Sequence, residues 1–252
     1  MLLNQWVCRC PLCHAWPLHQ RDLPWCESCE HIWQRRGHEG TLDPRLLSAI
    51  EGCSYALPFD WPWHEPIRRF KLLQDTGWSH AWGRLMGQAL IQEQTQSVQW
   101  DWIGMPQTPQ RWAQRGGYDP VALMIEHTRR WLRSQGMVLG PWRKHALHKR
   151  QTHQRVQHSL GRHERWLAVN DAFAWSDDTP CPTNGANGNA LLVDDILTTG
   201  ATLTAAARVL KKAGYSRIWA LTLARTPAPD WSNQAQFGTF RDHHVSHRSG
   251  ST

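Results

Sequence analysis

A strand, a short loop and a helix are predicted in succession over residues 190–214, ALLVDDILTTGATLTAAARVLKKAG, and this unit constrains the fold most. Residues 190–193 are all apolar, as in a strand of a parallel sheet that is covered on both faces. Residues 202–213 place leucines and alanines at helical spacing, and Gly214 is suited to end the helix. A binding loop is therefore expected between them, since open α/β sheets bind ligands at the carboxyl ends of their strands.

The loop between this strand and helix carries two carboxylates and a group of hydroxyls. Main-chain N–H groups at the beginning of a helix favour a phosphate, and Gly200 permits close approach or a positive φ. Two adjacent carboxylates can accept hydrogen bonds from vicinal hydroxyls, directly or through Mg²⁺. We therefore expect a ribose 5-phosphate here, with its diol at Asp194 and Asp195. Its phosphate would lie against the residues that follow Leu197: Thr198, Thr199, Gly200, Ala201 and Thr202.

Five of the seven cysteines lie close together, in CRCPLCHAWPLHQRDLPWCESC at residues 8–29. They include two C-x-x-C pairs with twelve residues between them. Two thiolates in one tight turn can reach one tetrahedral Zn²⁺, and two such pairs complete a site with no open position. We therefore predict a structural zinc ribbon at residues 1–40, followed by a second domain at residues 41–252. The predicted ligands are Cys10, Cys13, Cys26 and Cys29.

Other assignments of these cysteines stay open. Cys8 could replace Cys10 as a ligand, and His14 is a lesser candidate. A redox C-x-x-C motif would need only one such pair beside a βαβ unit, and a disulfide is disfavoured where thiols stay reduced. Cys53 and Cys181 stand alone and are interpreted as ordinary small apolar residues.

An excess of positive charge favours polyanionic partners. The net charge is +7, from 28 Lys and Arg against 21 Asp and Glu. The excess is concentrated in a basic segment, residues 129–165, where ten Lys or Arg accompany one acid. The 17 tryptophans are interpreted mainly as core residues, although some could stack on bases. The sequence shows neither a signal peptide nor an apolar run of the ~20 residues that a membrane span needs, so we expect a cytoplasmic protein.

Helices and strands are expected to alternate along the rest of the chain. A helix over residues 119–136 has Asp119 as N-cap and Pro120 in its first turn. The remaining predicted elements are a helix at 78–93, strands within 98–106, 137–140 and 217–225, and a mobile loop or surface helix at 141–166. This order predicts an α/β fold with a mostly parallel sheet flanked by helices.

The strand, the acidic pair and the T-G-x-T loop resemble the phosphoribosyl pyrophosphate (PRPP) fingerprint of type I phosphoribosyltransferases. An acidic pair also ends a strand in response-regulator receivers, but LTTGAT has no role there. With the cysteine pairs in front, essentially the whole chain resembles the ComF family, also called ComFC or GntX. Three further stretches resemble family motifs: IRRFK, MPQTPQRWAQRGGYD and QHSLGRHERWLAVNDAF. The first two give the candidate pyrophosphate-binding cations: Lys71, Arg111 and Arg115.

The resemblance implies a type I phosphoribosyltransferase-like domain behind the zinc ribbon, with PRPP bound together with Mg²⁺. It also implies a role in natural competence and DNA uptake. The partners would be single-stranded DNA, competence helicases or recombination-loading proteins. The alternative is an active transferase that moves the phosphoribosyl group to a nucleobase or another acceptor. No general base is evident in the sequence, so turnover is left open.

Overall fold

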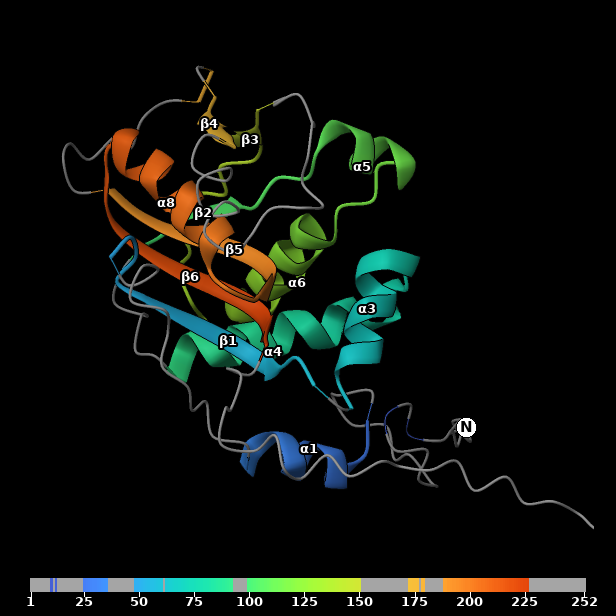
Figure 1. The fold of residues 1–252 in the computed structure, drawn as a ribbon. Coiled ribbons are helices and arrows are strands. Elements are labelled where there is room, and N and C mark those ends of the chain that lie inside the picture. Colours follow the sequence, from blue (N-terminus) through green and yellow to red (C-terminus); the bar gives the residue numbers. More distant parts are fainter. Residues whose placement is uncertain are drawn as a thin grey trace, which may run out of the picture.

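Four parallel strands form the central sheet of the computed structural model, in the order β1-β6-β5-β2 (Figure 1). The strands are β1 (Gly52–Pro58), β2 (Asp101–Gly104), β5 (Gly188–Leu197) and β6 (Tyr215–Arg225). The structure describes residues 10, 12, 25–35, 48–60, 62–92, 99–150, 172–176, 178–179 and 188–226. Within them, the parallel α/β sheet expected from the sequence is confirmed.

Helices cover both faces of this sheet (Figure 1). On one face, α4 (Ser79–Gln92) packs against β1 and β6, and α6 (Pro120–Ser134) packs against β5, whose Leu191 and Val193 belong to the core on this side. On the other face, α8 (Ala201–Lys212) packs against Ala190 and Leu192. The apolar run at 190–193 is explained by this two-sided burial, because successive side chains of a strand point to opposite faces.

The smaller elements surround the ends of the sheet. They are α1 (Glu27–Arg35), α3 (His64–Leu73), a 3₁₀ helix (Thr76–Trp78), α5 (Pro109–Gln114), β3 (Leu147–Lys149) and β4 (Phe173–Trp175). The last two strands pair with each other antiparallel and lie on the same side of the sheet as α8.

The predicted positions of α6, α8 and β6 agree with the structure. Asp119 caps α6 as predicted, since its carboxylate accepts a hydrogen bond from the N–H of Ala122 at 3.0 Å. Helix α8 begins and ends within one residue of its predicted bounds, and Gly214 beyond it has a φ of 99°. The predicted strand at 217–225 is confirmed within β6.

Two element predictions were wrong. Residues 137–140 do not form a strand, because their main-chain groups are bonded elsewhere. The N–H of Met137 donates to the carbonyl of Leu132, and the carbonyl of Gly140 accepts from the Arg129 guanidinium at 2.9 Å. The expected loop or surface helix at 141–166 instead contains strand β3, which pairs with the distant β4.

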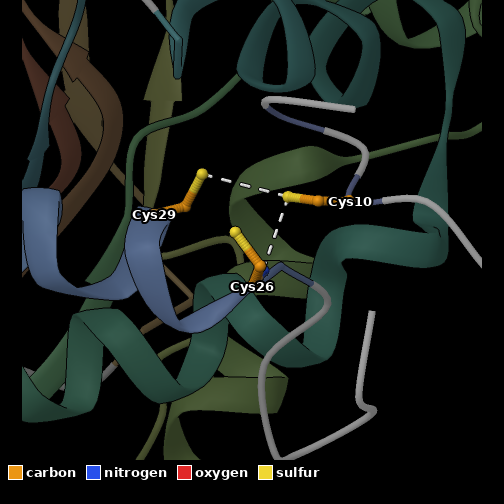
Figure 2. Close-up of side chains that lie close together, drawn as sticks. All are labelled: Cys10, Cys26 and Cys29. Carbon is orange, nitrogen blue, oxygen red and sulfur yellow. Dashed lines mark hydrogen bonds between the residues drawn. The ribbon is translucent and has the colours of Figure 1, made fainter. Parts of the chain in front are cut away.

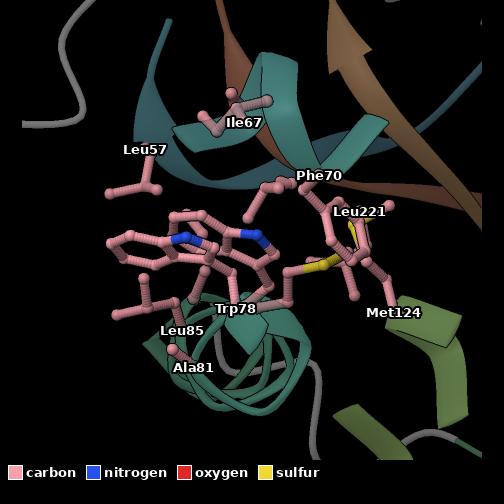
Figure 3. Packing of buried hydrophobic residues seen from close by; sticks show 14 of the residues in the cluster. Leu57, Ile67, Phe70, Trp78, Ala81, Leu85, Met124 and Leu221 are labelled. Carbon is pink, nitrogen blue, oxygen red and sulfur yellow. The ribbon is translucent and has the colours of Figure 1, made fainter. Parts of the chain in front are cut away.

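Tryptophans fill much of the core on the α4 side, as the sequence analysis expected. Trp63 and Trp82 are fully buried, and Trp25 is 2% exposed. Trp78 stacks on Trp82 with 5.0 Å between ring centroids, and Trp25 lies 5.1 Å from Trp63. Figure 3 shows Trp78 among the aliphatic side chains of this cluster. Trp25 therefore joins the cysteine segment to the core.

None of the helices within the described residues is both long and apolar enough to cross a membrane. The predicted boundary at residue 40 lies outside the described residues, and the division into residues 1–40 and 41–252 stays a prediction.

Candidate functional site

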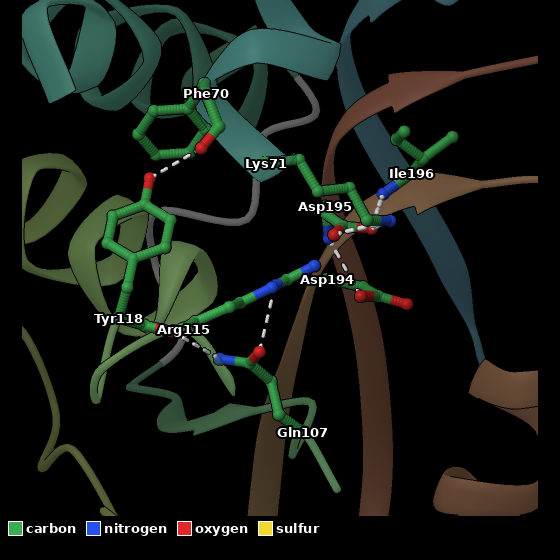
Figure 4. Close-up of polar contacts among 8 residues, drawn as sticks. All are labelled: Phe70, Lys71, Gln107, Arg115, Tyr118, Asp194, Asp195 and Ile196. Atoms are coloured by element: carbon green, nitrogen blue, oxygen red, sulfur yellow. Dashed lines mark hydrogen bonds and ion pairs between the residues drawn. The ribbon is translucent and has the colours of Figure 1, made fainter. Parts of the chain in front are cut away.

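The acidic pair belongs to strand β5 itself. The sequence predicted a strand that ends at Val193, but β5 continues to Leu197 because β6 pairs with it as far as Arg225. Adjacent residues of a strand point to opposite faces, so the two side chains leave β5 in different directions, although their charges still interact. Figure 4 shows Asp195 directed toward α3 and Asp194 directed away from it.

A salt bridge joins Asp195 to Lys71 at the end of α3 (Figure 4). The Nζ atom of Lys71 lies 2.7 Å from the Asp195 carboxylate, and the two side chains are 29% and 13% exposed. The sequence separation is 124 residues, so the fold brings this predicted cation directly to the predicted diol-binding acid. One carboxylate oxygen of Asp195 also accepts its neighbour's main-chain N–H, from Ile196, at 2.7 Å.

Asp194 lies in a less polar environment on the other face of β5. Burial and the nearby charge of Asp195 raise the pKa of Asp194 to about 7. The N–H of Asp195, which donates to its carboxylate at 2.8 Å, and the cations Lys71 and Lys149 oppose this shift. Asp194 therefore holds its proton more readily than an ordinary aspartate does.

Lys149 also interacts with the acidic pair, although nothing in the sequence associated it with this site. Burial and the charges of Arg111 and Lys71 lower the pKa of Lys149, while Asp194 and Asp195 oppose the shift. Its ammonium group, which lies 5.7 Å from the centroid of the Phe173 ring, is therefore within electrostatic range of the acidic pair. The sequence showed only one lysine among many in the basic segment, since its position depends on the pairing of β3 with the distant β4.

A hydrogen-bonded brace holds Arg115 beside the acidic pair (Figure 4). The guanidinium donates to the side-chain oxygen of Gln107 at 2.9 Å, and it extends toward the Lys71–Asp195 pair. The Gln107 amide donates in turn to the carbonyl of Tyr118 at 2.9 Å, and the Tyr118 hydroxyl donates to the carbonyl of Phe70 at 2.7 Å. The loop after β2 is thereby tied to α3.

Arg111 lies on α5, where its side chain is exposed. Its main-chain N–H donates to the Thr108 hydroxyl at 3.2 Å, which caps this short helix. Its charge is close enough to Lys149 to lower the pKa of that lysine. All three predicted cations are therefore found on the elements that surround the acidic pair.

The hydroxyl-rich loop has the conformation that its glycine predicts. Gly200 is buried with a φ of 76°, in the left-handed region that favours glycine. Its carbonyl accepts from both the N–H and the hydroxyl of Thr204, at 2.8 and 2.9 Å, and this begins helix α8. The side chains of Thr198, Thr199 and Thr202 are exposed, and Ala201 is half-buried. Main-chain N–H groups of the first helical turn have no intrahelical acceptor, so this loop can receive an anion.

Three of the four predicted zinc ligands form a cluster (Figure 2). The sulfur atoms of Cys10, Cys26 and Cys29 all lie within 4.8 Å of one another, and those of Cys10 and Cys29 are 3.9 Å apart. Sulfurs bound to one tetrahedral Zn²⁺ at ~2.3 Å are separated by about 3.8 Å, so this cluster fits such an ion. Cys13 and the alternative ligand Cys8 lie outside the described residues.

Comparison with known proteins supports one class of domain. Residues 161–236 match the family model described as a phosphoribosyl transferase domain. This segment contains β5, the hydroxyl-rich loop, α8 and β6. The chain therefore carries a phosphoribosyltransferase-type domain, and the acidic pair and its loop lie inside the matched segment.

A solved structure of a hypoxanthine phosphoribosyltransferase from Staphylococcus aureus is also similar to this chain, with 12% sequence identity and a TM-score of 0.35. The match covers 59% of this chain and 64% of that protein, which is less than two thirds of its length. No curated protein matches the sequence.

Proposed function

We propose that this domain binds PRPP with Mg²⁺ at the carboxyl end of β5. The observation that carries the proposal is the placement of Asp194 and Asp195 near the end of β5, where Asp195 lies five residues before the left-handed Gly200 and α8 begins directly after that glycine. The 5-phosphate would accept hydrogen bonds from loop N–H groups and from the exposed threonine hydroxyls. The ribose hydroxyls would donate to the carboxylates.

The surrounding cations would hold the pyrophosphate. Lys71 lies on α3, Lys149 on β3, and Arg111 and Arg115 on α5 and at its C-terminal end, so these cations could contact one multiply charged group from several sides. Lys71 already neutralises Asp195 without ligand. We therefore propose that Lys71 exchanges Asp195 for the pyrophosphate when PRPP binds, and that the ribose hydroxyls take its place.

The acidic pair also fits Mg²⁺, which is bound through carboxylates and substrate phosphates. Because the Lys71 ammonium group occupies the Asp195 carboxylate, a metal ion would reach this acid only after that exchange. Mg²⁺ would supply charge neutralisation of the pyrophosphate. The expected consequence is that metal and PRPP bind together rather than metal alone.

Isothermal titration with PRPP·Mg²⁺ tests the site. The variant with Asp194→Asn and Asp195→Asn should lose binding while its circular dichroism spectrum stays native. Thr128→Ser, in the buried part of α6, is a control remote from the loop. Unchanged affinity in the double variant would overturn the proposal.

We further propose the biological role that the ComF resemblance implies, namely DNA uptake and use, with single-stranded DNA or DNA-processing proteins as partners. Lys144, His148 and Arg150 are exposed on the described part of the basic segment. Arg143 is paired with Asp101 at 2.9 Å, and the charge of Lys149 interacts with the acidic pair, so we propose Lys144 and Arg150 as the DNA contacts. Lys144→Glu with Arg150→Glu should weaken binding of a single-stranded oligonucleotide and flatten its salt dependence. If the double variant and the wild type bound the oligonucleotide with equal affinity at low salt, this surface would not be the DNA-binding surface.

Phosphoribosyl transfer is the second candidate function, carried by the match to the transferase domain model. Pyrophosphate would leave the anomeric carbon through an oxocarbenium-like state, stabilised by the cations around the acidic pair. Release of pyrophosphate from PRPP in the presence of individual nucleobases tests this function. PRPP binding without release for any acceptor would favour a binding role.

For the cysteine cluster we propose Zn²⁺, with Cys13 as the fourth ligand. Four thiolates would leave no open position on the metal, so its role would be structural. Cys29 lies in α1 and Cys26 directly precedes it, and both pack with Trp25 against the α4 side of the core. The metal would thus stabilise a segment that has little core of its own.

A further inference from the structure

A cavity at the carboxyl end of β2 adjoins the proposed PRPP site without being part of it. Its volume is about 180 Å³, and its lining includes Met105 after β2, Trp112 on α5, Ile125 on α6 and Trp142. Neither aspartate of the acidic pair is among the described residues that line it. Leu147 of β3 does line it, while Lys149, two residues further along that strand, does not line it and interacts electrostatically with the acidic pair.

Trp112 in this cavity is unlike the tryptophans of the core. It is 55% exposed, whereas Trp82 and Trp102 are buried to within 1%. A Cβ atom at Gly117 would lie 3.3 Å from the Trp112 ring, so the bare glycine lets the main chain pack closely against one part of the indole. Trp112 is thereby held with much of its surface toward solvent, which costs the free energy of exposing an aromatic ring unless a ligand covers it.

Cations stand at the rim of the cavity. The Nζ atom of Lys144 lies 4.3 Å from the centroid of the Trp142 ring, and both Lys144 and His145 are exposed. Arg143 also lines the cavity, but its charge is balanced by Asp101 at 2.9 Å. Lys144 is therefore the rim cation best placed to meet an anionic group of a ligand.

Asp119 adds an acceptor to the cavity wall. Its Oδ1 atom caps α6, and Asp119 is among the residues that line the cavity. A carboxylate has two oxygens with about four acceptor positions, so it can accept a further hydrogen bond from an amino or ring N–H group of a ligand. The cavity thus combines aromatic walls, one acidic acceptor and a cationic rim.

We propose that this cavity binds a nucleotide, with the base against Trp112 and the phosphate at Lys144. The volume of about 180 Å³ is below the ~300–1,000 Å³ of pockets that enclose drug-sized ligands. It suits one ring system, so the sugar and phosphate lie outside, toward the cationic rim. Aromatic side chains stack on bases of any sequence, and an acidic acceptor favours bases that carry an amino group.

Deoxyadenosine 3′-monophosphate is the probe for this site, because it has neither a 5-phosphate nor a ribose diol and so does not fit the proposed PRPP site. Isothermal titration of the full chain should detect its binding. Trp112→Ala should weaken the affinity about ten-fold through loss of stacking, whereas Trp112→Phe should retain most of it. Lys144→Ala should weaken binding and reduce its salt dependence. Because Trp112 and Lys144 are exposed, these variants should fold normally.

Asp194→Asn separates this inference from the proposed function. It should leave binding of the deoxynucleotide unchanged and abolish binding of PRPP·Mg²⁺. Trp112→Ala should weaken binding of the deoxynucleotide and leave binding of PRPP·Mg²⁺ unchanged. Absence of deoxynucleotide binding, equal affinity in Trp112→Ala, or loss of binding in Asp194→Asn would each overturn the nucleotide cavity. Titration with a short single-stranded oligonucleotide shows whether the ligand is part of a DNA strand or a free nucleotide. If the oligonucleotide binds and its binding depends on Trp112, the ligand is a strand. If only the mononucleotide binds, the ligand is a free nucleotide.

Discussion

The salt bridge between Lys71 and Asp195 should be the strongest single link between α3 and the sheet. Its atoms lie 2.7 Å apart, which corresponds to a Coulomb attraction of about 1.5 kcal/mol at the permittivity of water and about 6 kcal/mol at an effective permittivity of 20. Desolvation offsets much of the larger value, since the side chains are only 29% and 13% exposed. We therefore expect a net coupling free energy of ~1–3 kcal/mol, between the values typical of exposed and buried pairs.

A double-mutant cycle measures this coupling. Urea unfolding is followed for the wild type, Lys71→Met, Asp195→Asn and the double variant, with zinc in constant excess. The matched control is the pair Arg68–Glu65 on the same helix, with a 2.9 Å contact and side chains 52% and 48% exposed. Its coupling should be clearly smaller, because water and salt screen a pair that is this exposed. If the coupling of Lys71 with Asp195 did not exceed that of the control pair, the reasoning that places Lys71 in the site before ligand binds would be refuted.

Three more predictions concern the site loop and the cysteine cluster. The free energy of unfolding of the wild type should fall as pH rises from about 4 to 7, and Asp194→Asn should abolish this fall. Burial raises the pKa of Asp194 to about 7, so the native state keeps a proton that the unfolded chain releases as pH rises through this range, and wild-type stability falls. Urea midpoints across this range check it, and parallel profiles would contradict it. Gly200→Ala should destabilise the protein by ~1–2 kcal/mol, because φ is 76° there, and thermal melting should show a lower Tm. Cys26→Ser should abolish stoichiometric metal, whereas Cys53→Ser on β1 should retain it; elemental analysis that finds equal metal in both would exclude the cluster as the site.

Much of this site was predictable from the sequence because its signals are local. The N-cap at Asp119 and the left-handed Gly200 depend on residues within a few positions, and both were identified correctly. The acidic pair was found because its strand, loop and helix are contiguous. The length of β5 was underestimated, since its last residues are polar and only pairing with β6 keeps them in the strand.

What the sequence could not supply is which distant side chains meet the acidic pair. Lys71 was a candidate only through the resemblance of IRRFK to a family motif, and its contact with Asp195 spans 124 residues. Lys149 was one basic residue among many until β3 paired with β4. Gln107 carried no signal at all, although it positions Arg115 through a single hydrogen bond. Such contacts depend on tertiary packing, which no local pattern encodes.

The tryptophan cluster gives the cysteine site an optical readout. Trp25 directly precedes Cys26 in the chain, and its ring lies 5.1 Å from that of Trp63 and 6.0 Å from that of Trp78. Indoles at such separations couple electronically, so a small rotation of one ring changes the near-ultraviolet circular dichroism of the group. A change in the position of Cys26, such as one caused by metal loss, would shift the adjacent Trp25 and so change the packing of this cluster. The protein thus carries an intrinsic chromophore for the state of its thiols, with no label attached.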